Sequence, residues 1–379
     1  MSGLWVLNQN DSDVLIIGAG PAGLATAYAL KQLGIECCVI ERGKQVGYAW
    51  TQTYESLTLH TGKHFSHLPG MNFPASTPLF PTRKNLLDYL SGYAEKFKLN
   101  IETDCKAIQV AHNDSGWKVD TSRDEKRARF LVIATGIITN PFVPVLEGQE
   151  KFSGRIIHSA AYRKPEGYRG KSVLVIGIGN SAAEITVELA RYGIDVTISV
   201  RTGAHVVPLR LFGVPIQYHS VLVQKLPRSV RDLMVKAMEK LTRALRGPPV
   251  LPKPSYSVLD RQPVIGFKIV EEIRKGRIKQ RGGIREFTKK GVIYEDGNMG
   301  EFDEVILATG FRSALSMFGG TISLDDRGFA RCDGVVSVDN PDLYFVGHNY
   351  STIGGLRNIY HDSQLAARLI GDRYAASGA

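Results

Sequence analysis

Two glycine-rich loops are the residues in this chain whose types and spacing most directly imply chemistry. The first reads Gly-Ala-Gly-Pro-Ala-Gly over residues 18–23, and the second reads Gly-Ile-Gly-Asn-Ser-Ala over residues 177–182. In such loops the first glycine permits a tight turn, the second lets the backbone approach a pyrophosphate, and the third lets helix and strand pack closely. The following helix N-terminus then faces the phosphates with free N–H groups. Each loop therefore predicts a dinucleotide site.

The residue at the end of the next strand distinguishes the two sites. In the first copy it is Glu41, whose carboxylate we expect to accept hydrogen bonds from ribose hydroxyls. In the second copy it is Val200, followed by Arg201 and Thr202. The missing carboxylate removes repulsion against a 2′-phosphate, which the planar fork of Arg201 can grip. Because Arg42 stands at the matching place in the first copy, it is the missing acid that favours NADPH in the second.

Short apolar strands and helices must position both loops. Residues 13–18 and 172–177 are apolar runs that end in glycine, which is typical of buried parallel strands, and helical sequence follows each run. The two loops and the turns after their helices correspond at a constant offset of 159 residues. An internal repeat of a βαβ unit predicts an α/β fold with two Rossmann-like dinucleotide-binding domains.

Two later strands suggest where the chain crosses between these domains. Both end in Ala-Thr-Gly, at residues 134–136 and 308–310. We expect a discontinuous FAD-binding domain over residues 1–149 and 308–379, with an NADPH-binding domain inserted over residues 150–307. Two dinucleotides in one chain imply electron flow, in which NADPH delivers hydride and FAD is the natural acceptor.

The cysteine pattern argues against a disulfide reductase, a disulfide framework and a zinc site. The four cysteines are Cys37, Cys38, Cys105 and Cys332. No CxxC pair occurs among them, and Cys37 and Cys38 fall within an expected buried strand. This pattern fits a reducing, cytoplasmic compartment. We expect no metal, and we interpret the spacing of His60, His64 and His67 as that of loop residues at the FAD site.

Charge and hydropathy exclude several other classes. The net charge of +10 suits a protein that binds polyanionic cofactors, and no motif for binding nucleic acid appears. No run of about 18 apolar residues predicts a membrane span, and residues 1–13 lack the regions of a secretory signal. A basic amphipathic stretch over residues 229–246 predicts a surface helix on the core, with a role at a membrane surface or in substrate entry left open. Its apolar face carries Leu233, Ala237, Leu241 and Leu245.

Residues 152–162 resemble the identifying motif of flavin-containing monooxygenases, FxGxxxHxxx(F/Y), through Phe152, Gly154, His158 and Tyr162. The motif stands just before the second glycine loop, as in that family, and the late Ala-Thr-Gly-Phe of residues 308–311 resembles another family motif. Baeyer–Villiger monooxygenases of the usual type carry tryptophan where this chain has Tyr162, so they match less well. The resemblance covers nearly the whole chain.

Within this family the chain is most similar to the YUCCA branch, which makes auxin from indole-3-pyruvate. The matching stretches are residues 53–54, 57–60, 68–69, 80–82, 89–90, 93–94, 179–181 and 307–313. That branch also has histidine at the position of His60, where many flavin monooxygenases have asparagine. The chain departs from the family at Gly62, which replaces a proline. The Gly347-His348 pair replaces the Gly-Asp of many related reductases.

The resemblance implies an FAD- and NADPH-dependent monooxygenase in which oxygen adds at flavin C4a to give a peroxide or hydroperoxide. The YUCCA branch implies oxidative decarboxylation of an aryl 2-oxo acid, such as indole-3-pyruvate to indole-3-acetate. N- or S-oxygenation of a small amine or sulfide, and an NADPH oxidase or redox sensor without oxygenated product, stay open. A cationic side chain in the substrate pocket would favour a 2-oxo acid as the substrate. Arg210, Arg312 and Arg357 are candidates for this side chain. The expected partners are molecular oxygen and a small-molecule substrate, for a monomer or homodimer.

The motifs and the resemblance together predict a set of site residues. His60 and Lys63 are the catalytic candidates near the flavin, with loop packing and pyrophosphate or surface contact as their alternative roles. We expect a turn at Gly154 and a structural role for His158. The predicted cofactor-binding residues are Gly18, Gly20, Pro21, Ala22, Gly23, Glu41, Arg42, Trp50, His60, Thr135, Gly136, Gly177, Gly179, Asn180, Ser181, Arg201, Thr202, Ala308, Thr309, Gly310, Gly347 and His348.

Overall fold

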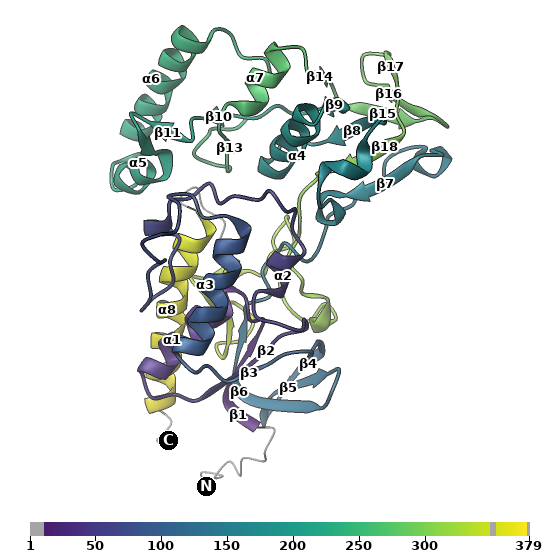
Figure 1. The fold of residues 1–379 in the computed structure, drawn as a ribbon. Helices are drawn as coiled ribbons and strands as arrows, with labels where there is room; N and C mark the ends of the chain where they lie inside the picture. The colour runs from purple at the N-terminus through teal and green to yellow at the C-terminus, as the bar shows by residue number, and fades with distance from the viewer. Residues whose placement is uncertain (1–10, 349–353, 377–379) are drawn as a thin grey trace.

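The computed structural model describes residues 11–348 and 354–376, and its main sheets lie one above the other (Figure 1). The first sheet has nine described strands in the order β19-β20-β21-β6-β1-β2-β3, with β4 and β5 joined to it through β6. The strands are β1 (Asp11–Ile17), β2 (Cys37–Ile40), β3 (Ile101–Glu102), β4 (Ala107–Asn113), β5 (Gly116–Thr121), β6 (Glu125–Ile133), β19 (Cys332–Asp333), β20 (Val336–Ser337) and β21 (Leu343–Phe345). From β21 to β3 neighbouring strands are parallel. Residues 1–10, where we expected no secretory signal, lie outside the described residues.

The second sheet has the order β14-β9-β8-β18-β7, and its neighbouring strands are all parallel. Its strands are β7 (Arg155–His158), β8 (Ser172–Ile176), β9 (Asp195–Ser199), β14 (Ile278–Arg281) and β18 (Glu304–Leu307). An antiparallel sheet packs beside it and consists of β15 (Ile284–Phe287), β16 (Gly291–Tyr294) and β17 (Met299–Glu301). The predicted α/β fold with two Rossmann-like units is confirmed. The strands of the second sheet lie between residues 155 and 307, within the range of 150–307 predicted for the NADPH-binding domain.

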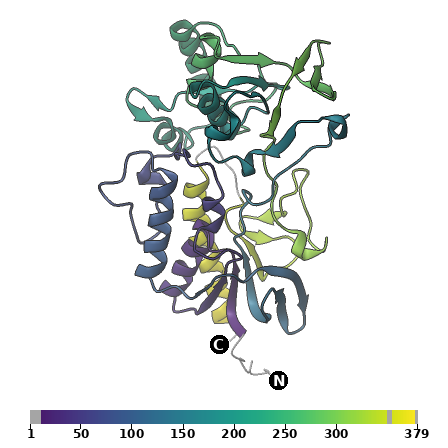
Figure 2. The same ribbon diagram turned by 45° about the vertical axis from the view of Figure 1, so that its right-hand side comes forward.

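Helices cover one face of each sheet. α1, α3 and α8 lie side by side against the first sheet (Figures 1 and 2), and α1 packs on both of the others. α4 and α7 pack together on the second sheet. The α-helices are α1 (Pro21–Gln32), α2 (Tyr48–Thr51), α3 (Arg83–Lys96), α4 (Asn180–Arg191), α5 (Ile216–Val223), α6 (Arg228–Arg246), α7 (Lys268–Arg274) and α8 (Gly355–Ala376). Short 3₁₀ turns are η1 (Lys63–Phe65), η2 (Gln149–Lys151), η3 (Ser159–Ala161), η4 (Pro165–Tyr168) and η5 (Ser316–Phe318).

Strand β1 is apolar along its second half because both faces of its sheet are covered. Val14 and Ile16 belong to the core beneath α1 and α8, whereas Leu15 and Ile17 belong to a second core on the opposite face together with Trp117. A strand buried on both sides gives a continuous apolar run in place of an alternating one. This explains why the sequence predicted β1 correctly.

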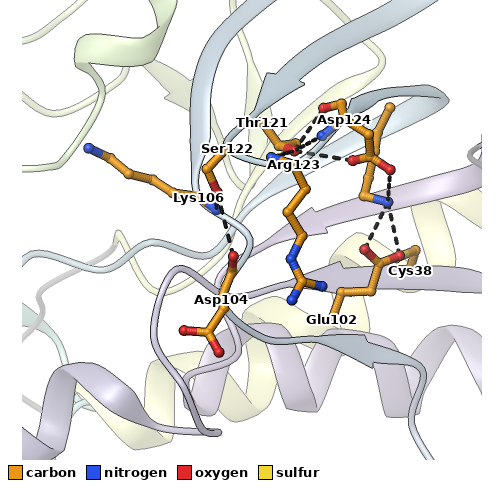
Figure 3. A network of polar contacts seen from close by, with 9 residues as sticks. Cys38, Glu102, Asp104, Lys106, Thr121, Ser122, Arg123 and Asp124 are labelled. Atoms are coloured by element: carbon orange, nitrogen blue, oxygen red, sulfur yellow. Dashed lines mark hydrogen bonds and ion pairs between the residues drawn. The ribbon is translucent and has the colours of Figure 1, made fainter.

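A polar network fixes the edge of the first sheet beside β2 (Figure 3). The Lys126 ammonium lies 2.8 Å from the Glu102 carboxylate and 3.4 Å from that of Asp124, and its side chain is only 4% exposed. The Cys38 thiol donates to Glu102, and burial raises the pKa of Cys38 to about 12. A buried cation needs such partners, because removing one leaves an uncompensated charge. Cys38 is therefore held as an unreactive thiol.

The two crossings between the halves of the molecule run side by side. Pro141 and Phe311 form an antiparallel bridge. The Phe142 N–H donates to the Gly310 carbonyl at 2.9 Å, and the Arg312 N–H donates to the Asn140 carbonyl at 2.9 Å. The connection between the sheets is therefore a pair of hydrogen-bonded segments.

Helix α6 forms where the amphipathic stretch predicted a helix, but none of its residues is buried. Our expectation that its apolar face packs on the core is wrong, since Leu233, Leu241 and Leu245 are all exposed. α6 belongs to a long segment between β9 and β14 that also holds α5. The same segment contains the short strands β10 (Val206–Val207), β11 (Arg210–Leu211), β12 (Val214–Pro215) and β13 (Val264–Ile265).

Candidate active site

The first glycine loop turns directly from β1 into α1. Gly18 has a φ of +112°, and a Cβ there would lie 2.6 Å from the Ala134 carbonyl oxygen. A Cβ on Gly23 would lie 1.9 Å from the Gly18 carbonyl oxygen. Gly20, the N-cap of α1, faces open space, and no side chain caps the helix. An uncapped helix N-terminus beside an open backbone fits a pyrophosphate.

The second loop repeats this geometry at the start of α4. A Cβ on Gly177 would lie 2.4 Å from the Ala308 carbonyl oxygen, while Gly179 faces open space at an N-terminus without a side-chain cap. Asn180 accepts a hydrogen bond from the Ile265 N–H at 2.8 Å and donates to the Pro263 carbonyl at 3.2 Å. Its side chain therefore fastens the loop to β13.

Arg201 follows the end of β9 and is exposed. It has no ion pair or hydrogen bond from its side chain among the residues that the structure describes. Val200 beside it is buried, so no carboxylate stands next to the guanidinium. Arg201 is therefore available to an anion bound at this end of the second sheet.

A cavity of about 1340 Å³ extends from the first glycine loop to α5 and α6. This volume exceeds the usual range of roughly 300–1,000 Å³ for small-molecule sites. The predicted site residues that line it are Gly18, Gly20, Pro21, Ala22, Glu41, Arg42, Trp50, His60, Thr135, Gly136, Asn180 and Gly347. Those that do not line it are Gly23, Lys63, Gly177, Gly179, Ser181, Arg201, Thr202, Ala308, Thr309, Gly310 and His348. The cavity thus contains most of the first predicted site and touches the second at Asn180.

Glu41 lines the cavity at the end of β2 and is almost completely buried. Its Oε2 accepts the Ala19 N–H and its Oε1 accepts the Gly43 N–H, both at 2.9 Å. These bonds hold the glycine loop and the turn after β2 together. Each carboxylate oxygen keeps a further lone pair for a ribose hydroxyl.

His60 contacts Glu184 of α4 across the boundary between the halves of the molecule. Its Nε2 lies 2.6 Å from Glu184 Oε1. The Tyr54 hydroxyl donates a short hydrogen bond to the other oxygen. Burial, together with the Glu184 charge, raises the pKa of Tyr54 well above its ordinary value, so the hydroxyl stays protonated. The carboxylate accepts from both groups, which assigns the hydrogen of the histidine ring to Nε2.

Lys63 lies on η1 but does not reach the cavity. Its ammonium donates to the Ala75 carbonyl at 2.8 Å and to the Thr77 carbonyl at 2.7 Å. The structure therefore gives Lys63 a role in loop packing and does not place it among the residues that could face a flavin.

The three histidines of this region have separate partners. His64 Nδ1 lies 2.6 Å from the Tyr218 hydroxyl, and His67 Nδ1 lies 3.1 Å from the Leu68 carbonyl. Among the described residues, no group of three or more His, Cys, Asp or Glu side chains is arranged to hold a metal ion.

The motif of residues 152–162 acts through packing. His158 Nε2 donates to the Gly310 carbonyl at 3.0 Å, and its Nδ1 accepts the Ala160 N–H at 3.1 Å. Burial lowers the pKa of His158, which keeps the ring neutral. Tyr162 is fully buried and donates to Glu188 at 2.8 Å. The ring of His158 thus ties this motif to the late Ala-Thr-Gly motif.

Glycine is required at position 154 because neighbouring atoms lie too close to its backbone for a side chain. The chain bends at Gly154 just before β7, where we expected a turn, but the φ of Gly154 is not in the left-handed region. A Cβ at this position would lie 2.4 Å from the Asp303 carbonyl oxygen and 2.6 Å from the ring of Phe152. The lack of space beside β18 is therefore the reason that this position requires glycine.

The late motifs divide between the cavity and the protein interior. Thr309 donates to the Phe142 carbonyl, so it stabilises the crossing. Gly347 lines the cavity, whereas the next residue, His348, does not. Both ring nitrogens of His348 are buried without a hydrogen-bond partner among the described residues, and burial lowers its pKa to about 4. His348 is therefore a neutral ring packed near Phe345.

None of the three arginines considered as pocket cations lines the cavity. Arg210 lies over the ring of Phe80, Arg312 over that of Phe142 and Arg357 over that of Phe65. A different cationic side chain, which the sequence analysis did not single out, lines the cavity. Arg231 of α6 lines the cavity, and its Nε is buried without a partner among the described residues. The missed signal was the spacing of Arg231, Val235, Met238 and Thr242, which share one face of the helix, are partly buried and line the cavity.

Comparisons with known proteins show which family the chain belongs to. Residues 15–207 match the family described as pyridine nucleotide-disulphide oxidoreductase. The described cysteines are all free, and burial raises the pKa of Cys37 to about 12. No helix in the described part of the chain has the length and apolar character needed to cross a membrane.

Several relatives match over most of their length. The chain is 32% identical over 376 residues to a probable indole-3-pyruvate monooxygenase, YUCCA1 of Arabidopsis thaliana. The aligned region covers 95% of this chain and 90% of the relative. It is 32% identical to the indole-3-pyruvate monooxygenase YUCCA1 of Oryza sativa subsp. japonica, over 90% and 86% of the two chains. A flavin-containing monooxygenase from Stenotrophomonas maltophilia shares the fold, with a TM-score of 0.78, 23% identity and coverage of 97% and 100%. The chain therefore belongs to the flavin-dependent monooxygenase family that includes the YUCCA proteins, and it is an enzyme that uses FAD and NADPH.

Proposed function

We propose that this monooxygenase oxidatively decarboxylates an aryl 2-oxo acid of the indole-3-pyruvate type. The observation that carries the proposal is the unpaired, buried Nε of Arg231 on the cavity wall. A buried N–H without a hydrogen-bond partner is costly, and a substrate carboxylate would accept a charge-assisted hydrogen bond from it. The names of the relatives at 32% identity support the same substrate class.

The remaining wall suits the aryl part of such a substrate. Around Arg231 the cavity is lined by Met234, Val235, Leu211 and Ile216. Apolar walls with a few placed polar groups are typical of small-molecule sites, and they also exclude water. A carboxylate at Arg231 would fix one end of the substrate while these side chains contain the ring.

The overall reaction balances with the two cofactors of the family. A 2-oxo acid anion, dioxygen, NADPH and one proton give the shortened carboxylate, carbon dioxide, NADP⁺ and water. Bound FAD would accept hydride from NADPH and supply the reduced flavin that reacts with oxygen. The chain's own contribution is binding, orientation and exclusion of water.

We assign the binding roles as follows. The open backbone at Gly20 and Gly179 would receive the pyrophosphates of FAD and NADPH, Glu41 the FAD ribose and Arg201 the 2′-phosphate of NADPH. The FAD domain would comprise residues 1–149 and 308–379, and the NADPH domain residues 150–307. Of the other cavity-lining residues predicted from the sequence, Asn180 would contact NADPH and the rest would surround FAD.

His60 is a residue of the proposed site that can hold a proton beside the cavity. It lines the cavity wall, and its Nε2 is engaged by Glu184. Glu184 thereby sets the orientation and tautomer of the ring. We retain His60 as the catalytic candidate and Glu184 as its positioning residue, and we drop Lys63 from the candidate set.

A panel of substrates tests the proposed class. Holoenzyme is supplied with NADPH and separately with indole-3-pyruvate, phenylpyruvate, trimethylamine or a thioether, and products are identified by mass spectrometry while hydrogen peroxide is measured. We expect loss of carbon dioxide from an oxo acid with little peroxide. An N- or S-oxide would replace the proposal with amine or sulfide oxygenation. Full recovery of peroxide with every substrate would indicate an NADPH oxidase.

A further inference from the structure

Helix α6 turns its apolar leucines toward solvent, whereas an ordinary surface helix turns its apolar residues toward the core. Its residues Arg231, Val235 and Met238 line the cavity and are partly buried. The residues on the other side, Leu233 and Leu245, are 68% and 75% exposed. An amphipathic helix normally turns its apolar stripe to the core. Here the stripe of Leu233, Ala237, Leu241 and Leu245, which we call the outward stripe, faces away from the protein.

Exposed apolar side chains gather around this helix. Nine of the sixteen large apolar side chains that are exposed in the described residues lie between Phe212 and Leu245. Phe212 is 85% exposed at the tip of the β11–β12 hairpin and has a φ of +50°, which is costly for an aromatic residue. The hairpin packs on α5, the helix just before α6. Such a concentration of exposed apolar groups marks an interaction surface.

The charges beside this surface are positive. The sequence contains no acidic residue between Asp195 and Asp232. Lys236 and Lys240 follow Leu233 by three and seven residues, so they border the outward stripe on the helix. Neither of them, nor Lys225, has an ion pair or side-chain hydrogen bond among the residues described.

The acidic residues of α6 lie away from the stripe and are already engaged. Asp232 lies 3.9 Å from Arg228, and Glu239 lies 3.4 Å from His205. The border of the outward stripe therefore presents only cations. Two copies that paired through this surface would bring like charges together, which disfavours a dimer. An anionic surface complements it.

We propose that the outward stripe of α6, with the exposed residues that precede it, docks on an anionic lipid surface. An apolar stripe bordered by lysines is the pattern of a helix that lies in the membrane interface, with its leucines below the headgroups and its ammonium groups among the phosphates. Basic residues near such a surface add attraction that salt screens. Leu233, Leu241 and Leu245 do not line the cavity, whereas Lys236 and Lys240 both line it and border the stripe. Docking would therefore place the stripe in the lipid with these lysines at the border between the lipid surface and the cavity.

Vesicle co-sedimentation of the holoenzyme tests this proposal. We expect binding to vesicles of phosphatidylcholine with phosphatidylserine, weaker binding to phosphatidylcholine alone and release at high salt. The triple variant L233E/L241E/L245E should bind anionic vesicles at least about tenfold more weakly, because each leucine loses its apolar contact. None of these residues lines the cavity, so NADPH oxidation and flavin content should be retained.

A matched variant separates this effect from a general change of surface charge. V145E/M299E/V338E places three glutamates at exposed apolar positions outside the proposed face. It should bind vesicles like the unchanged protein. Equal loss in both variants, or no binding of the unchanged holoenzyme to anionic vesicles, would overturn the proposal. It would also be overturned if light scattering shows a dimer that only the α6 variant dissociates, because a second copy would then cover the face.

Discussion

His60 and Glu184 lie 2.6 Å apart although 124 residues separate them in the sequence. His60 belongs to the segment after α2, and Glu184 lies on α4, directly after the second glycine loop. Tyr54 donates to the same carboxylate. One carboxylate thus fastens the proposed FAD domain to the helix that would carry the NADPH phosphates.

Replacing this carboxylate should slow hydride transfer. Glu184→Gln keeps the shape but loses the charge that holds His60 and Tyr54, so the nicotinamide and the flavin should be aligned less well. We expect flavin reduction by NADPH to slow by roughly tenfold, since small misplacements cost large factors in rate. Stopped-flow absorbance of the flavin under anaerobic conditions measures this rate.

Glu188→Gln serves as its control, because Glu188 lies one turn further along α4 and holds Tyr162 instead. It should lower stability while leaving the reduction rate near its original value. If both variants reduce the flavin at the original rate, the His60–Glu184 contact has no part in positioning.

The assignment of Arg231 predicts a change confined to the oxo acid. Arg231→Ala should raise the KM for the oxo acid by about tenfold to a hundredfold, the usual range for a lost charge-assisted hydrogen bond. Arg231→Lys should recover part of the loss. Steady-state kinetics should leave the KM for NADPH unchanged, and an equal rise in both constants would assign Arg231 to the cofactor.

The assignment of Arg201 is tested by comparing the two nicotinamide cofactors. Arg201→Ala should raise the KM for NADPH much more than the KM for NADH, because only NADPH carries the 2′-phosphate. A loss of about tenfold or more is expected for one charge-assisted contact. Lys279 is a suitable control, since it is exposed at the edge of the same sheet and pairs with Asp195. Equal effects on both cofactors would refute the role.

Gly154 should be needed for packing. Gly154→Ala places a methyl group 2.4 Å from the Asp303 carbonyl oxygen, and such overpacking typically costs about 1–3 kcal/mol. Chemical denaturation should show this loss, with flavin reduction by NADPH unchanged in the folded enzyme. Gly167→Ala is the matched control, because a Cβ there meets nothing within 4 Å. A stable Gly154→Ala variant with impaired flavin reduction would instead indicate a direct catalytic role for the motif.

His348 predicts a dependence of stability on pH. Burial lowers its folded pKa to about 4, whereas an unfolded histidine titrates near 6.5. Between these values the unfolded chain binds more protons, so stability should fall as the pH falls from about 6.5 towards 4, with a slope approaching ~1.4 kcal/mol per pH unit from this residue. His348→Phe should reduce that slope in denaturation experiments, and an unchanged slope would contradict the assignment.

The sequence predicted the parts of this molecule that are locally determined. The loop at Gly18, its strand and its helix follow from residues within about one βαβ unit, and Glu41 stands where that unit requires it. The same reasoning could not orient α6, because its hydrophobic pattern predicts an inward apolar stripe whether or not a core lies beneath it. Arg231 was missed for that reason. The contact of His60 with Glu184 and the loop carbonyls around Lys63 depend on tertiary packing, which no local pattern encodes.

The paired crossings at Pro141 and Phe311 limit how the two halves of the enzyme can move. A single connecting strand would act as a swivel with freedom in every direction. Two extended segments joined by hydrogen bonds form a flat ribbon, which bends easily perpendicular to its plane and resists shear and twist. We therefore expect any opening that admits NADPH or releases a product to follow the one direction in which this pair of segments bends easily.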